Sequence, residues 1–204
     1  MAKKKPQLVD ATGRPYTKQA RTLVLYWETP FENPRKQLVA DLPIGEVRQE
    51  DLRNIDQIKE KFDIIAAVAC LQCMEPSKVP TTVEKLASML NLKGELYITT
   101  PSFEWAAEQI NNPEPHPLIH MVMCGTEKIP HRSVFTLLWL RQIIQQAHLV
   151  PRYATPELYQ LTVNGQPMEM VRNYVIGWKY DDHTPSTAVD DPDSSGGLPE
   201  LAIE

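Results

Sequence analysis

The chain has 204 residues, of which 42% are hydrophobic and 23% are charged, and its formal net charge is −5 at pH 7. These values are typical of a single globular α/β domain with a buried core. The acidic balance disfavours a nucleic-acid partner. The lack of an apolar run of about 18 residues, or of an apolar signal segment, predicts a cytoplasmic protein with no membrane contact.

The two ends of the chain differ in charge from the middle. Residues 1–6 form a basic tail, whereas residues 181–204 hold seven acidic side chains and no Lys or Arg. The second segment is poor in large apolar side chains, so we predict a disordered acidic tail. The folded domain is expected over residues 7–180, and the acidic tail is a candidate for docking on a protein partner or on a second copy of the chain in a homo-oligomer.

Apolar runs bounded by turn-forming residues predict seven strands. In chain order they are QLVDA (7–11), TLVLYWE (22–28), KQLVADL (36–42), FDIIAAVA (62–69), GELYITTP (94–101), PELYQLTV (156–163) and MEMVRNYVIGWKY (168–180). Apolar residues at helical spacing predict helices over 79–91, with Thr81 or Thr82 as the N-cap, and over 133–149. Asn164-Gly165 is a strong signal for a two-residue turn between antiparallel strands.

The alternation of strands and helices predicts the fold class. Strands that are apolar throughout are typical of a parallel sheet that is covered on both faces. We therefore predict an α/β fold with a mostly parallel, Rossmann-like sheet, helices on both faces and a C-terminal antiparallel hairpin. The N-terminal part is abbreviated, because the eight residues between Gly13 and the next strand are too few for a turn and a full helix.

Five motifs resemble class I S-adenosylmethionine-dependent methyltransferases, in particular the small members that modify metabolites and glycans. FDII (62–65) with LQC (71–73) is similar to the family's middle strand and its Leu-Glu-His, and LNLKGELYITTP (90–101) to the strand that follows. HRSVFTLLWLRQIIQQAHL (131–149) resembles a later helix, and TLVLYWE and LVADL resemble the second and third strands. The resemblance covers roughly residues 23–180. It implies a methyltransferase with S-adenosylmethionine as cofactor and a small molecule or glycan as acceptor.

The resemblance also implies cofactor-binding residues. Glu28 would hold the ribose hydroxyls, since a carboxylate accepts hydrogen bonds from two vicinal hydroxyls at once. Asp41 and Leu42 match the positions that contact the adenine. Asp10 and Gly13 correspond to what is left of the Gly-rich turn that receives the cofactor in the family.

Other reactive side chains have a functional and a structural interpretation. His131 matches the position that closes over the acceptor and would act as a weak general base, or it is a surface or helix-capping group. Cys70 and Cys73 form a C-x-x-C without a second cysteine pair, so we interpret them as small buried apolar residues. His116 and His120 are four residues apart, but the neighbouring prolines disfavour one continuous helix, and no metal site is predicted.

Two functions from different classes stay open at this point. The first is an active methyltransferase, in which catalysis rests mainly on proximity and alignment. The second is a pseudoenzyme, a catalytically inactive methyltransferase-fold protein with a structural or interaction role in an assembly. The second is supported by the lack of any glycine between Gly13 and Gly45, and by Gln72-Cys73 in place of the family's Glu-His.

Overall fold

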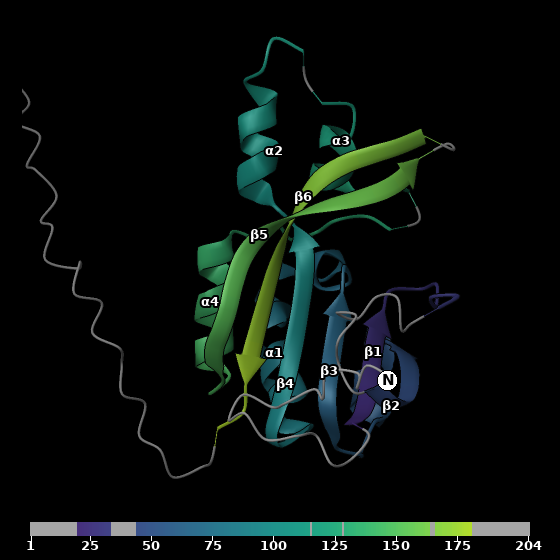
Figure 1. Ribbon diagram of the computed structural model, residues 1–204, viewed down its shortest axis with the longest axis vertical. Coiled ribbons are helices and arrows are strands. Elements are labelled where there is room, and N and C mark those ends of the chain that lie inside the picture. The colour runs from purple at the N-terminus through teal and green to yellow at the C-terminus, as the bar shows by residue number, and fades with distance from the viewer. Residues whose placement is uncertain (1–19, 34–43, 115, 128, 164–165, 181–204) are drawn as a thin grey trace, which may run out of the picture.

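The computed structural model describes residues 20–33, 44–114, 116–127, 129–163 and 166–180 (Figure 1). Six strands form one sheet in the order β2-β1-β3-β4-β6-β5. They are β1 (Ala20–Tyr26), β2 (Ile44–Asp51), β3 (Phe62–Val68), β4 (Leu90–Pro101), β5 (Val150–Val163) and β6 (Gln166–Trp178). The first four are parallel, and the β5–β6 hairpin adds to β4 in antiparallel orientation. The predicted mostly parallel sheet with a C-terminal hairpin is confirmed.

The central strands are apolar throughout because both of their faces are buried. On β1, Leu23 and Leu25 belong to the core on the helix side of the sheet, whereas Val24 belongs to a smaller cluster on the opposite face. On β3, Ile65 and Ile64 divide between the same two clusters. This alternation follows from the two-residue period of a strand.

The described residues form four α-helices, which lie in two groups. Helices α1 (Val79–Ser88) and α4 (Leu137–Gln146) contact each other and cover one face of the sheet, so among the described residues the sheet-covering helices share a face. Helices α2 (Phe103–Ile110) and α3 (Ile119–Cys124) stand beyond the carboxyl end of β4 and pack with the outer half of the hairpin (Figure 1). Helix α4 begins after the N-cap Thr136, whose hydroxyl accepts from the Trp139 amide.

Two predicted details differ from the structure. Helix α1 has Lys78 at its N-cap, so Thr81 and Thr82 lie inside the helix, because a 3₁₀ turn over Pro76–Lys78 already leads into it. Strand β2 was not predicted. It is one of the two edge strands of the described sheet, and most of its side chains are only partly buried, so its sequence IGEVRQED lacks an apolar run.

Several predictions lie outside the described residues. They concern the tails 1–6 and 181–204, the strands 7–11 and 36–42, and the Asn164-Gly165 turn, although Val163 and Gln166 on either side of that turn are paired. Among the described residues, no helix is long and apolar enough to cross a membrane.

Candidate functional site

The position of β1 in the sheet identifies the turn that matters for a cofactor. In doubly wound sheets of this kind the first strand lies between the second and the fourth, and the Gly-rich turn follows the first strand. Strand β1 pairs directly with β2 on one side and β3 on the other, so that Val24 lies beside both Gln49 and Ala66. Strand β1 therefore holds the first-strand position, which corrects the assignment of TLVLYWE to the second strand. Strand β2 holds the second.

The turn after β1 is tight and contains no glycine. Glu28 has a φ of 64°, and the Thr29 amide donates to the Trp27 carbonyl across it at 2.7 Å, which closes a three-residue turn. The Phe31 amide then donates to Oε1 of Gln49 at 2.9 Å, and Nε2 of Gln49 donates to the Phe31 carbonyl at 3.0 Å. The segment is thus fastened to β2.

Asp51 ends β2, at the position where the second strand of such folds carries the ribose-binding acid. Its side chain is nearly fully buried. Oδ1 accepts from the amide and Nε of Arg53 at 2.9 and 3.0 Å, and Oδ2 accepts from Nη2 of Arg53 at 2.7 Å and from the Glu28 amide at 3.0 Å. The hydrogen bond from the Arg53 side chain holds the pKa of Asp51 below its usual range. These four bonds use the acceptor sites that a carboxylate has.

Arg53 connects the two positions. Its Nη1 donates to Oε1 of Glu28 at 3.2 Å, and its guanidinium lies 5.5 Å from the centre of the Trp27 ring. We call Trp27, Glu28, Asp51 and Arg53 the edge cluster. Glu28, predicted to bind ribose, is therefore an ion-pair partner of Arg53 in this structure. Sequence reasoning missed Asp51 because β2 itself was missed.

The other predicted cofactor residues, Asp10, Gly13, Asp41 and Leu42, lie outside the described residues. At the described part of this edge, the chain's groups do not fit S-adenosylmethionine. The amides of Glu28, Thr29 and Phe31 already donate within the chain, and the carboxylate of Asp51 already accepts four hydrogen bonds. A backbone that receives a cofactor needs free N–H groups at this turn.

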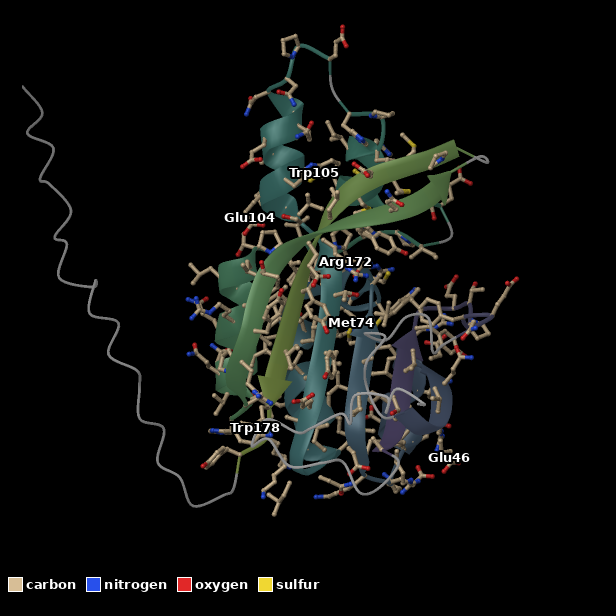
Figure 2. All side chains as sticks on the ribbon, in the orientation of Figure 1. Glu46, Met74, Glu104, Trp105, Arg172 and Trp178 are labelled. Atoms are coloured by element: carbon tan, nitrogen blue, oxygen red, sulfur yellow. The ribbon has the colours of Figure 1, made fainter. Side chains whose placement is uncertain are left out.

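A cavity of about 270 Å³ lies farther along the same edge, beyond the ends of β3 and β4. Helix α3, the segment that follows it and the hairpin strands β5 and β6 contribute the remaining walls. Figure 2 shows Arg172, one of the lining residues, where the hairpin leaves the sheet. Most lining side chains are apolar; those are Phe31, Val68, Ala69, Pro101, Met121, Val122, Ile129 and Met170.

Three polar atoms of cavity-lining residues are buried without a hydrogen-bond partner. They are Oε1 of Gln72, Oγ1 of Thr100 and Nε of Arg172. Gln72 and Thr100 are 4% and 1% exposed. Nearly all buried polar atoms in folded proteins are paired, so these three are exceptions. They are shielded from solvent and therefore lie behind the cavity wall, not on its surface.

The backbone at the end of β3 orients Gln72. Ala69 has a φ of 45°, a strained value for a residue with a side chain. Its amide donates to the carbonyl and hydroxyl oxygens of Thr99, and its carbonyl accepts from Nε2 of Gln72 at 2.7 Å. The backbone carbonyl of Gln72 in turn accepts from the amides of Arg132 and Ser133. Gln72 occupies the position of the glutamate in the family's Leu-Glu-His.

His131 also lines the cavity. Its Nδ1 lies 2.9 Å from the Val122 carbonyl, and burial lowers the pKa of the ring. The imidazole is therefore neutral at pH 7, with the proton on Nδ1 and an acceptor at Nε2. The structure thus brings His131 together with Gln72, Thr100 and Arg172, and leaves Glu28 in the edge cluster. Its role as a base stays a prediction.

The cysteines of the C-x-x-C are buried and free. Burial raises the pKa of the Cys70 thiol strongly and that of the Cys73 thiol to about 12, so both are unreactive thiols at pH 7. In the described part of the chain, no group of three or more His, Cys, Asp or Glu side chains is placed to hold a metal ion.

Comparisons with solved structures support the fold. A structure concerned with the conversion of a disulfide bond into a thioacetal group during echinomycin biosynthesis aligns over 79% of this chain and 76% of its own, with a TM-score of 0.52 and 12% identity. A SAM-dependent methyltransferase from Methanosarcina mazei aligns over 79% and 93%, with a TM-score of 0.49 and 13% identity. TehB from Haemophilus influenzae aligns over 80% of this chain, with a TM-score of 0.48 and 15% identity.

The chain shares its fold with the structure from echinomycin biosynthesis. Its mostly parallel sheet with a C-terminal antiparallel hairpin has the Rossmann-like architecture that the resemblance predicts. The chain spans 58% of the length of TehB. No protein-family model and no curated protein matches it. Sequence identities as low as these support a shared fold and say nothing about activity.

Proposed function

We propose that this chain is a catalytically inactive methyltransferase-fold protein that binds a small molecule in the cavity at the ends of β3 and β4. One observation carries the proposal: the carboxylate of Asp51 is already saturated by Arg53 and the Glu28 amide. A ribose at this position would have to displace the guanidinium. The Asp51 carboxylate is buried while the Arg53 side chain is half-exposed, and removing charged hydrogen-bond donors from a buried carboxylate is costly, so the edge cluster opposes the cofactor.

The cavity supplies the binding part of the proposal. Ligands of open α/β sheets bind outside the carboxyl ends of the strands, and this cavity lies there. Polar atoms buried behind its wall lack partners, whereas those of Asp51 have them. The open alternative, an active methyltransferase, needs both the cavity and an accessible cofactor edge.

Titration of the purified protein with S-adenosylmethionine and S-adenosylhomocysteine tests the proposal. We expect no heat in calorimetry and no rise in melting temperature at millimolar ligand. A ligand at about 100 times its dissociation constant stabilises the folded state by about 2.7 kcal/mol, which a thermal shift detects readily. Saturable binding of either compound to the wild-type protein would contradict the proposal.

Two arginine variants identify the cause. Arg53→Gln removes the two guanidinium hydrogen bonds to Asp51 and keeps those from the Arg53 and Glu28 amides, whereas the control Arg48→Gln removes an arginine of β2 that pairs with Glu50 and Glu60. Binding that appears only in Arg53→Gln shows that the edge cluster is the barrier to the cofactor.

A further inference from the structure

We infer that the cavity binds a small aromatic molecule that carries one carboxylate and one hydroxyl group. The inference names the ligand class and rests on the proposed function for the use of the cavity as a binding site. It starts from the size and walls of the cavity, its charge, and an acceptor on its wall.

The walls favour a small ring. At about 270 Å³ the cavity falls just below the range of about 300–1,000 Å³ that holds drug-sized ligands, so its occupant is smaller. Phe31 comes from the turn after β1, Met121 from α3 and Met170 from β6. Thioether sulfurs and aromatic side chains make favourable contacts with an aromatic ring.

The charge of the cavity favours a carboxylate. Among the described residues that line it, Arg172 alone carries a full charge, because His131 is neutral at pH 7. Nη2 of Arg172 pairs with Glu157 at 3.2 Å, but Glu157 does not line the cavity, so the guanidinium is the charged group on its wall. The guanidinium is held 4.7 Å from the centre of the Tyr159 ring. A fixed, cationic N–H donor binds a carboxylate more strongly than a neutral acceptor.

His131 favours a hydroxyl group on the ligand. Its Nδ1–H donates to the Val122 carbonyl, which leaves Nε2 as an acceptor on a residue of the cavity wall. A hydroxyl group satisfies such an acceptor, whereas a simple aromatic acid or a hydrocarbon leaves it unpaired at a cost.

The three hydroxybenzoate isomers are the probes, with benzoate, phenol and 4-hydroxycyclohexanecarboxylate as matched controls. The isomers vary the separation of the two polar groups on one ring, and each control lacks the hydroxyl, the carboxylate or the aromatic ring. We expect at least one isomer to bind about tenfold more tightly than every control in calorimetry. The inference is overturned when no isomer binds at about 10 mM, or when a control binds as tightly as the best isomer.

Arg172→Met and Arg152→Met test the position of the carboxylate. Both arginines form an ion pair and lie over an aromatic ring, but Arg152 pairs with Glu95 and lies over Trp178, away from the cavity. Arg172→Met should weaken binding of the best isomer by about tenfold or more, and Arg152→Met should not change it. Equal binding by the two variants overturns the inference.

Met121→Trp is a second way to test the site, because it fills the cavity from α3 without touching an ion pair. It should abolish binding of the best isomer, and unchanged binding would place the ligand elsewhere. The two proposals fail separately. Binding of S-adenosylmethionine contradicts the proposed function whatever the aromatic acids do, and a lack of hydroxybenzoate binding contradicts only this inference.

Discussion

Two neighbouring parts of one sheet edge differ in how far their buried polar groups are hydrogen-bonded. At the ends of β1 and β2, the carboxylate of Asp51 has every acceptor site filled by the chain itself. At the ends of β3 and β4, Gln72 and Thr100 are as deeply buried but keep an oxygen without a partner. The first part satisfies its own polar groups and the second does not, so one strand frame can leave buried polar atoms unpaired along one half of an edge only.

The largest effect is expected from Asp51→Ala. The substitution leaves Arg53 and the Glu28 amide without their partner and removes the N-cap of the following 3₁₀ helix, Leu52–Gln57. We expect a loss of about 2–4 kcal/mol in the free energy of unfolding, measured with urea. The control Glu60→Ala removes an exposed partner of Arg48 and should cost less than about 1 kcal/mol. Similar losses in the two variants would show that the edge cluster is not a special part of the structure.

Acid should weaken the same cluster. The ordinary pKa of an aspartate, which Asp51 has in the unfolded chain, is about 3.9. Arg53 holds the pKa of Asp51 in the folded protein below that value. At a pH between the folded and the unfolded pKa, the unfolded chain therefore binds more protons than the folded one. Stability from Asp51 is therefore complete above the unfolded pKa and is lost as the pH falls through the folded one. The stability difference between wild type and Asp51→Asn, measured by urea unfolding, should be constant near neutral pH and shrink below about pH 4. A difference that persists in acid would contradict this account.

Two equally buried threonines, one on β1 and one on β4, allow the two halves of the edge to be compared directly. Thr22 on β1 and Thr100 on β4 are each 1% exposed, but the Thr22 hydroxyl donates to the Ala20 carbonyl at 3.3 Å and the Thr100 hydroxyl has no partner. Thr22→Val should cost about 1 kcal/mol, and Thr100→Val should be neutral or stabilise the protein by up to about 1 kcal/mol. Thermal unfolding of both variants measures the contrast. Equal costs would mean that the Thr100 hydroxyl is satisfied after all.

The smallest effect concerns the turn at Glu28. Glu28→Ala removes the exposed ion pair with Arg53 and keeps the positive φ, whereas Glu28→Gly also relieves the backbone. The glycine variant should be more stable than the alanine variant by about 1 kcal/mol, as measured by urea unfolding. The reverse order would show that the turn is not strained.

The central strands were predictable, whereas β2, one of the two edge strands, was not. FDIIAAV and GELYITTP are buried on both faces, so their sequences contain continuous apolar runs. Strand β2 buries few apolar side chains at its position in the sheet, so its sequence is mostly polar. Helices α2 and α3 were missed because each is short and packs mainly on the other and on the hairpin, so neither has a long amphipathic period.

The site was predictable only in part. His131 was selected by resemblance and does line the cavity, but nothing in the sequence shows that Arg172, about 40 residues later, lies on the same wall. Their proximity depends on the hairpin returning over α3. Asp51 carried one usable signal, an acidic strand end about 20 residues beyond the first strand, which becomes informative once β1 is known to be the first strand.

The hairpin strand β6 has two neighbours along one half and a single neighbour along the other. Residues 172–178 pair with both β4 and β5, whereas residues 166–171 pair with β5 only. The outer amides should therefore exchange with deuterium through local fraying, at a lower free energy than the inner amides, which exchange only when the sheet opens. Met170 lies on the fraying half and in the cavity wall. An occupant of the cavity would thus slow deuterium uptake at 166–171 and leave that of 175–178 unchanged.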